Sequence, residues 1–458
     1  MSEEQQARSS LPPGPRLPKL VQGALFWRRV VWFFDRCRNR YGELFTVWAP
    51  PWGTIVVIAD PLAIRQIWAG DATVGDAGAA YGKIYDRAMG PRSLIVLDRE
   101  EHVRMKQLVA PAMHGERLRR YHELMSELAA AEVDSWPIGE PLRMADHSRR
   151  LTLEVILRVI IGLGGSEDEY IAKLRSALPE LLDPGVVLQT GWALPWLERV
   201  GPWRRVRRRI DALYALLDDL IARRRLEPDL EQRGDVLSHL ITARSADGRP
   251  LSHGELRDQL VMLLTAGHET TAAAIAWAIE RLIRHPEKLE RLRAEVHEGG
   301  TAYLDAVMKE TLRARPVLFG GLRKLATDVE VGGFRLPAGI HVSPSTCGLQ
   351  HSDAHWDGAL EFRPERFLDG SCDDSNWIPF GGGRRRCVGA AFAMAEIKTV
   401  LATLVTRVEL APVRERSERT RGKVVTQVPD RGAEAIVVRR LGAGSEPASA
   451  AVGEPAVT

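Results

Sequence analysis

One cysteine lies among glycines and arginines in the C-terminal part of the chain, in the segment FGGGRRRCVG (380–389). A helical pattern begins directly after this segment, at Ala390. The amide groups and dipole of a helix N-terminus lower the pKa of a nearby thiol, and the arginines add positive potential. Thiolates bind metals, and glycines let a backbone approach a flat surface. Cys387 is therefore a candidate ligand for a large anionic group that contains a metal.

The pattern around Cys387, taken alone, leaves two other interpretations open. A free cysteine in a turn, with the arginines solvated, would have only a structural role. A basic patch for nucleic acid is the weaker alternative, because the net charge of the whole chain is only +3 and three arginines offer few phosphate contacts.

A second group of chemically capable residues lies in AGHETT (266–271), within an otherwise apolar helical pattern. Gly267 is unfavourable inside a helix, and Thr270 can return a hydrogen bond to the carbonyl of Ala266. Glu269 is a charge in apolar surroundings, which is costly to bury. One interpretation is a single solvent-facing turn. The other is a functional break, in which Gly267 opens a groove and an acid and an alcohol deliver protons.

A candidate ion-pair cluster combines two distant segments. Glu310 and Arg313 in YLDAVMKETLRARP (303–316) are three residues apart on one helix face. Arg366 in FRPERF (362–367) supplies a second guanidinium. Two arginines around one carboxylate would form a rigid, hydrogen-bonded cluster if partly buried, whereas each pair alone could be a surface salt bridge.

The elements that must position these residues are mainly helical. Helical periodicity is found in seven segments: 115–134, 145–163, 205–226, 252–284, 286–297, 301–314 and 390–408. Ser252 and Glu255 have capping-box spacing at the start of the longest of them, and Pro286 follows its end.

Strand signals are few and clustered. Residues 42–61 predict two strands around a Pro-Trp-Gly turn, and 328–345 carries a similar signal. The proline-rich segment LPPGPRLPKL (11–20) predicts an extended strap. The expected fold is mainly α: one large helical domain over 11–441 with small antiparallel β-sheets. Residues 1–10 and 442–458 are expected to be disordered tails.

Composition limits the class of protein. The chain has 458 residues, of which 45% are hydrophobic and 27% charged, as is usual for a globular protein. Its four cysteines match neither a zinc site nor a disulfide framework. The sequence contains no run of about twenty apolar residues, so a transmembrane anchor is not expected. The N-terminal residues are polar. A cytoplasmic location is the expectation.

The glycine, arginine and cysteine segment resembles the haem-binding signature of the cytochromes P450. The matching positions are Phe380, Gly383, Arg385, Cys387 and Gly389. This signature is highly specific.

Three further motifs resemble that family and occur in its order. AGHETT is similar to the motif of its central helix, and Glu310 with Arg313 to its Glu-x-x-Arg pair, with Arg366 as partner. The strap segment PPGP (12–15) also matches, so the resemblance extends over nearly the whole chain. It implies a single cytochrome P450-like domain, in agreement with the helical pattern.

The resemblance also implies roles for individual residues. Cys387 would be the axial thiolate on the haem iron, and Phe380 would screen its sulfur. Ala266 and Gly267 would lie beside the oxygen site, where Glu269 and Thr270 would be the acid–alcohol pair. The haem propionates would be bound by a set of basic residues: Arg385, Arg323, His102 and, in a position where the family usually has arginine, Lys106.

The implied activity is that of a haem-thiolate monooxygenase with haem b (iron protoporphyrin IX). A thiolate ligand favours cleavage of the O–O bond, so one oxygen atom of O₂ would enter an apolar organic substrate by hydroxylation or epoxidation. The chain carries no flavin or iron–sulfur motif, which implies a separate ferredoxin and reductase. Arg384 and Arg386 are candidates for docking an acidic ferredoxin.

Two other functions are compatible with a haem-thiolate site: oxidation by peroxide or oxidative coupling, and haem-based sensing without turnover. The acid–alcohol pair argues against both. The resemblance places the substrate pocket in five segments: 75–97, 182–203, 262–270, 317–322 and 424–429. Their apolar residues include Val186, Val187, Leu188, Val317, Leu318, Phe319 and Val425.

Overall fold

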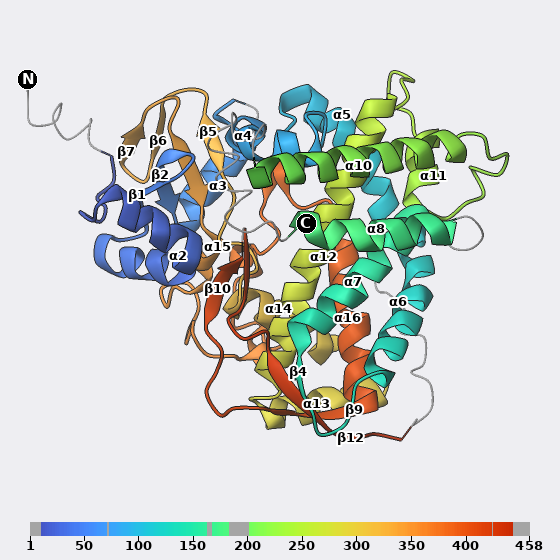
Figure 1. Ribbon diagram of the computed structural model, residues 1–458. Coiled ribbons are helices and arrows are strands. Elements are labelled where there is room, and N and C mark those ends of the chain that lie inside the picture. Colours follow the sequence, from blue (N-terminus) through green and yellow to red (C-terminus); the bar gives the residue numbers. More distant parts are fainter. Residues whose placement is uncertain (1–10, 71–72, 163–166, 183–200, 424, 443–458) are drawn as a thin grey trace, which may run out of the picture.

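The computed structural model describes residues 11–70, 73–162, 167–182, 201–423 and 425–442. Helices dominate this part of the chain, as the sequence predicts (Figure 1). The α-helices are α2 (Lys19–Tyr41), α3 (Pro61–Ala69), α4 (Ala77–Met89), α5 (Arg99–Val109), α6 (Glu116–Asp134), α7 (Met144–Ile161), α8 (Glu167–Leu182), α10 (Gly201–Arg224), α11 (Val236–Thr242), α12 (His253–Leu282), α13 (Pro286–His297), α14 (Ala302–Ala314), α15 (Thr346–Gln350) and α16 (Ala390–Arg407). Short 3₁₀ turns include η1 (Ala110–Met113), η3 (Pro364–Phe367), η4 (Asp374–Asn376) and η5 (Gly383–Arg385).

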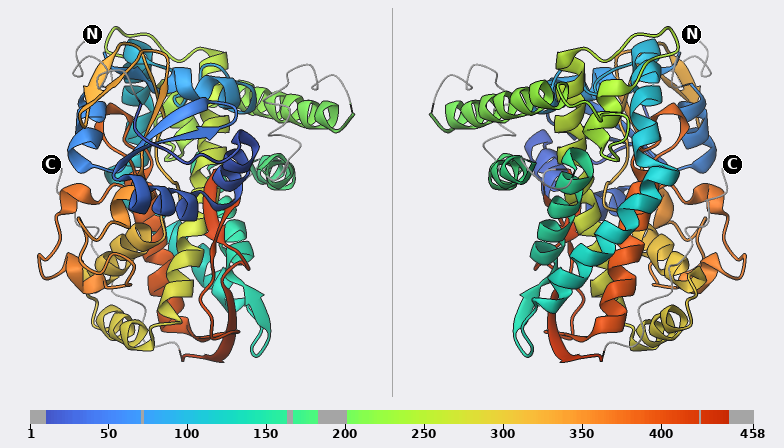
Figure 2. Two further views of the ribbon diagram at one scale, coloured as in Figure 1. Left: turned by 90° about the vertical axis from the view of Figure 1, so that its left-hand side faces the viewer. Right: turned by 90° about the vertical axis from the view of Figure 1, so that its right-hand side faces the viewer.

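The helical core is built around α12. This helix passes through the middle of the molecule, with α7 and α16 packed against it and α6 packed against these two helices (Figure 1). Their shared core includes Met125, Ile156, Leu260 and Leu401, each at most 2% exposed. In the side views, α10 extends outward beyond this core (Figure 2). The arrangement leaves α12 covered on nearly all sides, which explains its largely apolar sequence.

The start of α12 follows the predicted capping box. The hydroxyl of Ser252 accepts from the amide of Glu255 at 3.3 Å, and the Glu255 carboxylate accepts from the Ser252 amide at 2.8 Å. Two otherwise orphaned amides at the helix N-terminus are thereby satisfied.

The strands form four small sheets. β1 (Leu44–Ala49) and β2 (Gly53–Ile58) are the predicted hairpin, and they join a five-stranded sheet in the order β1-β2-β8-β5-β3. The other members are β8 (His341–Pro344), β5 (Arg323–Leu325) and β3 (Gly75–Asp76). Within this otherwise antiparallel sheet β2 and β8 pair in parallel, although about 280 residues separate them in the chain.

The remaining strands form one three-stranded sheet and two hairpins. β4 (Pro141–Arg143), β12 (Glu434–Arg440) and β9 (Val408–Pro412) form a three-stranded antiparallel sheet. Two hairpins complete the set: β6 (Val329–Val331) with β7 (Phe334–Leu336), and β10 (Thr420–Lys423) with β11 (Thr426–Pro429).

The proline-rich strap is extended up to Pro18, and α2 begins at Lys19, two residues before the predicted end of the strap. The strap lies against β1, where the amide and hydroxyl of Thr46 donate to the carbonyls of Pro13 and Pro12. Both predicted tails lie almost entirely outside the described residues. None of the described helices combines the length and the apolar character needed to span a membrane.

Candidate active site

A cavity of about 510 Å³ lies between α12, the segment 380–389 and the walls formed by α4, α10 and the β10–β11 hairpin. This volume is within the usual range for small-molecule and cofactor sites. The sequence-predicted residues that line it are Cys387, Phe380, Arg385, Gly389, His102, Lys106, Arg323, Ala266, Gly267, Glu269 and Thr270. Residues separated by almost 290 positions in the chain therefore meet in one space.

The segment 380–389 is a compact loop that presents Cys387 to the cavity; we call it the ligand loop. The amide of Cys387 donates to the carbonyl of Phe380 at 3.0 Å and closes the loop. Gly381 and Gly383 have φ angles of +68° and +62°. These values lie in the left-handed region, which favours glycine. The glycines thus serve the turn of the loop rather than only a close approach to a flat surface.

The sulfur of Cys387 opens onto the cavity and is otherwise surrounded by protein. Burial raises the pKa of this thiol, while the hydrogen bond from the Gly389 amide and the charges of Lys106 and Arg386 lower it only in part. The expectation that the helix N-terminus and the arginines give a lowered pKa is therefore wrong for the free thiol. A bound metal ion would supply the missing positive charge, since a coordinating thiol is deprotonated.

Basic residues gather along one edge of the cavity. His102 and Arg323 are 5% and 4% exposed. The pKa of His102 is lowered to about 3, first by burial and then by the positive charges of Arg385, Lys106 and Arg323. The imidazole of His102 is therefore neutral, and the cations Arg323, Arg385 and Lys106 beside it suit an anionic ligand, above all carboxylates.

The structure places Arg385 and Lys106 against the protein backbone as well as the cavity. Arg385 donates to the carbonyl of Leu97 and pairs with the carboxylate of Asp98. Asp98 also accepts from the amides of Gly78 and Ala79, both at 2.8 Å, at the start of α4. Arg385 therefore ties the ligand loop to the segment that leads into α5.

The acid–alcohol pair lies on the cavity side of α12. The hydroxyl of Thr270 donates to the carbonyl of Ala266 at 2.8 Å, as expected from the sequence. Glu269 is 14% exposed, and its Oε1 lies 3.2 Å from Nε of Arg149 and 3.3 Å from Nζ of Lys423. These two cations, from α7 and β10, compensate for the partial burial of the carboxylate.

Gly267 lines the cavity but does not interrupt the helix, so of the expected functional break the structure contradicts only the interruption. α12 runs without interruption from His253 to Leu282. A methyl group at Gly267 would lie 3.1 Å from Cδ1 of Ile156 in α7. The glycine thus permits close packing of the two helices beside the cavity.

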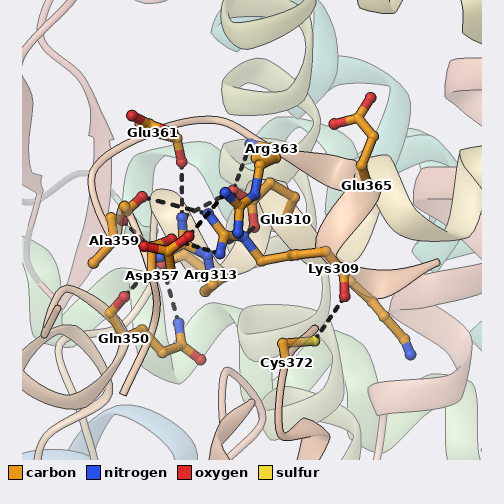
Figure 3. A network of polar contacts seen from close by, with 12 residues as sticks. Lys309, Glu310, Arg313, Gln350, Asp357, Ala359, Glu361, Arg363, Glu365 and Cys372 are labelled. Atoms are coloured by element: carbon orange, nitrogen blue, oxygen red, sulfur yellow. Dashed lines mark hydrogen bonds and ion pairs between the residues drawn. The ribbon is translucent and has the colours of Figure 1, made fainter. Parts of the chain in front are cut away.

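The predicted ion-pair cluster is fully buried, and Figure 3 shows its polar contacts. Nε and Nη2 of Arg313 donate to the two oxygens of Glu310 at 2.7 and 2.9 Å. Nε of Arg366 lies 3.3 Å from Oε2 of Glu310, and the amide of Arg363 donates to Oε1 at 2.7 Å. All three charged side chains of the cluster, those of Glu310, Arg313 and Arg366, are at most 1% exposed.

The remaining donors of the cluster bind backbone carbonyls. Arg313 donates to the carbonyls of Gln350, Ala359 and Glu361 at 2.7 to 2.9 Å, as Figure 3 shows. Arg366 donates to the carbonyl of Asp357 at 2.8 Å. The cluster therefore joins α14 to the irregular segment before η3, and a buried charge without such partners would be costly.

Four side chains at the site were not among the predicted residues: Arg149, Lys423, Asp98 and Trp68. Arg149 and Lys423 become visible only through their contacts with Glu269, because they come from elements far away in the sequence. Asp98 precedes a helix with acidic residues in its first turn, which is a helix-start signal. Trp68 belongs to α3 and lines the cavity.

The apolar wall of the cavity agrees in part with the expected pocket segments. Val317, Leu318, Phe319 and Val425 line the cavity, together with residues of 77–95 and 262–270. Val206 and Ile210 of α10 also line it. The predicted residues 186–188 lie outside the described residues.

These features fit haem in three ways. A thiol faces the cavity, a set of buried cations lies at one edge, and the remaining walls are largely apolar. A methyl group at Gly389 would meet nothing within 4 Å, so this side of the cavity has room beside the sulfur. One sulfur ligand, together with basic side chains that can bind carboxylates, is what haem with a thiolate ligand requires.

Comparison with known proteins gives the same result. The family model described as "Cytochrome P450" matches residues 12–432. Two proteins of Mycobacterium tuberculosis are similar over nearly their whole length. "Putative cytochrome P450 135B1" is 41% identical over 455 residues, covering 97% of this chain and 96% of that protein. "Putative cytochrome P450 135A1" is 36% identical over 438 residues, covering 95% and 97%.

A solved structure is similar as well. "Retinoic acid bound cyanobacterial CYP120A1" has a TM-score of 0.81 and 25% sequence identity, and the match covers 94% of this chain and 99% of that one. The fold, the cavity and these matches lead to one conclusion: the chain belongs to the cytochrome P450 family, whose general chemistry is haem-thiolate monooxygenation.

Proposed function

We propose that this protein inserts one oxygen atom of O₂ into a small apolar organic substrate, with haem b as cofactor and with electrons from a separate ferredoxin and reductase. The observation that carries the proposal is the shared cavity, which is lined by the Cys387 thiol and by the acid–alcohol pair Glu269 and Thr270. When bound, haem supplies the activation of O₂.

The protein's own residues have distinct proposed roles around the cofactor. Cys387 provides the sulfur ligand, Arg323 and Arg385 offer cationic partners to the carboxylates, and the imidazole of His102 can donate a hydrogen bond to them. Phe380 lines the cavity, and its carbonyl accepts a hydrogen bond from the amide of Cys387. Its ring would exclude water from the sulfur.

Proton supply is the proposed role of α12. Glu269 lines the cavity, where its carboxylate can accept and donate protons while Arg149 and Lys423 hold it in place. The hydroxyl of Thr270, one residue further, can donate a proton to a group in the cavity when it leaves the carbonyl of Ala266.

The substrate is proposed to be apolar because of the cavity wall. Met89, Ile95, Val206 and Leu318 come from four different segments and all line the cavity. The similar cyanobacterial structure is described with retinoic acid bound. Hydrophobic walls with few polar groups favour ligands of this general class.

The proposal is tested in two steps. The purified protein, reduced under carbon monoxide, should show a strongly red-shifted Soret band, and Cys387→Ser should lose it. A library of apolar compounds is then screened for a spin-state change of the ferric protein, and a binding compound is turned over under ¹⁸O₂ with a ferredoxin and reductase. Incorporation of one labelled atom into product is expected.

Two outcomes would contradict the proposal. A red-shifted band that survives in Cys387→Ser would remove the cysteine from the metal. Product that forms with peroxide but never with O₂ and reductant would favour the peroxide-driven alternative, which the intact acid–alcohol pair makes less suitable.

A further inference from the structure

Two side chains from outside the signature hold the ligand loop, one on each of two helices that precede it by hundreds of residues. Lys106 of α5 bonds its backbone, and Trp68 of α3 packs against one of its glycines. We propose that Lys106 and Trp68 form a clamp that fixes the position of the ligand loop and thereby of the Cys387 sulfur. This inference rests on the proposed function only in its reading of Cys387 as the ligand.

Lys106 bonds the loop at two points. Its Nζ donates to the carbonyl of Arg384 at 2.7 Å and to that of Arg386 at 3.3 Å. These carbonyls lie at the C-terminal end of the 3₁₀ turn η5, where backbone acceptors have no partner within the turn. A cation at this end is favoured by both hydrogen bonding and the local dipole.

The resemblance implies a different role for this position, where the family usually has an arginine that binds a propionate. An ammonium group is a compact charge with three donors, so it suits two backbone carbonyls as well as one carboxylate. Lys106 emerges from a firmly anchored helix: Met105, Leu108 and Val109 are at most 3% exposed. The amine is therefore fixed relative to the core, and it fixes the loop in turn.

Trp68 supplies the second contact. A methyl group built at Gly382 would lie less than 3.0 Å from three carbons of the Trp68 ring. The φ angle of Gly382 is −150°, which any residue can adopt, so glycine is required here by the close approach of the ring. α3 is anchored by Ile64 and Ile67, each 1% exposed. The indole thus limits movement of the loop from a second direction.

The clamp acts together with the contacts of Arg385 with Leu97 and Asp98, which tie the ligand loop to the segment before α5. The backbone of Cys387 is fixed by the hydrogen bond from its amide to the carbonyl of Phe380 and by the helix that follows, whereas residues 381–386 are a turn with two left-handed glycines. A loop of this kind opens easily unless side chains from outside hold it. Lys106 and Trp68 meet this need.

The first experiment measures the loop directly. Hydrogen–deuterium exchange of amides in 380–389 and in α16 is compared for the wild-type protein as purified, Lys106→Met and Lys106→Arg. Loss of two charge-assisted hydrogen bonds should accelerate exchange in the loop on the order of tenfold, with α16 unchanged. Lys106→Arg should restore most of the protection, because a guanidinium also donates to two acceptors.

The matched control is Lys173→Met. Lys173 is an exposed lysine on α8 whose amine bonds Glu169 at 2.6 Å, so its loss should leave the loop unchanged. If Lys106→Met leaves loop exchange at the wild-type rate and only releases haem faster, Lys106 serves a propionate and the clamp is refuted. Lys106→Gln, which can still donate to a carbonyl, keeps the test decisive should the methionine variant fail to fold.

The second experiment is a double-mutant cycle for Trp68. Gly382→Ala should disturb the loop by collision with the indole, and Trp68→Ala should loosen it. In the double variant the collision is absent, so the exchange rate of the loop amides should equal that of Trp68→Ala alone. The effects of the two single substitutions should therefore not add. Gly82→Ala, where a methyl group meets nothing within 4 Å, is the control. Strictly additive effects would contradict the contact.

The two proposals fail in different ways. A colourless protein, or a carbon monoxide spectrum without the red-shifted band, would contradict the proposed function, yet loop exchange could still be measured. Conversely, if Lys106→Met keeps the wild-type spectrum and its loop amides exchange at the wild-type rate, the clamp is contradicted and the proposed function is not. The lifetime of the red-shifted band in mild urea gives a spectroscopic measure of the same effect. This lifetime should be shorter in Lys106→Met than in the wild-type protein and unchanged in Lys173→Met.

Discussion

Glu269 shows how one charged side chain is accommodated on the apolar central helix. Its carboxylate lies at the cavity and is held by Arg149 from α7 and Lys423 from β10. The two cations, which come from two different elements, offset the free-energy cost of partly burying this charge. From the sequence only the anomaly could be recognised, because its partners are more than a hundred residues away.

Thr270→Ala should uncouple electron use from product formation. Without the hydroxyl, proton supply at the cavity is impaired, and the electrons appear as hydrogen peroxide. We expect product per reducing equivalent to fall on the order of tenfold, with peroxide rising correspondingly. Product and peroxide are measured together during reductant-driven turnover.

The control for this variant is Thr406→Ala. Thr406 makes the same type of hydrogen bond, to the carbonyl of Ala402 at 3.0 Å, but on α16 and away from the cavity. Unchanged product yield in Thr270→Ala would remove the hydroxyl from proton supply.

Glu396 is a buried acid that the proposed chemistry does not use. It lies on α16, is 1% exposed, and its Oε1 has no hydrogen-bond partner among the described residues. Burial raises its pKa well above the ordinary value of 4.5, so the folded protein keeps it neutral where the unfolded chain ionises it.

This difference predicts a pH-dependent stability. Above pH 4.5 the folded state binds one proton more than the unfolded state, so the free energy of unfolding falls as pH rises toward the folded-state pKa. Glu396→Gln should remove up to about 1.4 kcal/mol of this decline per pH unit. Urea unfolding of both proteins at several pH values measures it, and parallel pH profiles would show that Glu396 is ionised in the fold.

At the scale of elements, the buried cluster of Glu310, Arg313 and Arg366 connects α14 to the segment before η3 (Figure 3). Its two arginines also bind backbone carbonyls of residues 350–361. This segment has little regular structure of its own, so the cluster takes the place of a backbone ladder.

Glu310→Gln should therefore be strongly destabilising. It leaves two buried guanidinium groups without their counter-ion, at a cost of about 3–5 kcal/mol in the free energy of unfolding. Glu116→Gln is the matched control, since Glu116 pairs with Arg120 at 3.1 Å on the surface of α6. That change should cost about 0.5 kcal/mol or less. Equal losses in the two variants would mean that burial adds nothing to the pair.

The predictability of elements follows their signals. α12 and α13 could be located because a capping box and Pro286 mark their ends. α4 could not, because its sequence AGAAYGKIYDRAM is rich in alanine and glycine and its helicity depends on packing at the cavity. α5 was expected only through the resemblance, since charged residues dominate it.

Strand pairing was the least predictable feature of the fold. The hairpin of β1 and β2 follows from its turn, but the parallel pairing of β2 with β8 joins segments whose separation no local pattern reveals. The same limit applies to the site. Cys387 and the acid–alcohol pair were found through their own residue types, whereas Trp68, Lys423 and Arg149 depend on tertiary contacts.

At the scale of the whole molecule, a net charge of only +3 conceals local asymmetry. Arg384 and Arg386 are both exposed on the ligand loop, and their carbonyls are the acceptors of Lys106. A basic surface next to the sulfur would attract an acidic electron donor. The cytoplasmic location and the limits of the domain stay predictions.

Charge reversal tests this docking surface. Arg384→Glu, alone and with Arg386→Glu, should slow reduction by an acidic ferredoxin by about tenfold or more at low ionic strength, and the salt dependence should flatten. Stopped-flow reduction under carbon monoxide measures the rate. Arg439→Glu, on the exposed part of β12, is the control. A rate that does not respond to Arg384→Glu would place the docking surface elsewhere.

The cavity draws on the chain from Trp52 to Thr426, and its sulfur comes from residue 387. During synthesis on the ribosome, α12 emerges long before the ligand loop, and the β10–β11 hairpin that closes the wall emerges later still. The apolar lining of the cavity therefore stays incomplete until translation is nearly finished. Under the proposed function, capture of the cofactor through this sulfur would be a late event in biogenesis, and a nascent chain that stalls before position 387 would lack the ligand.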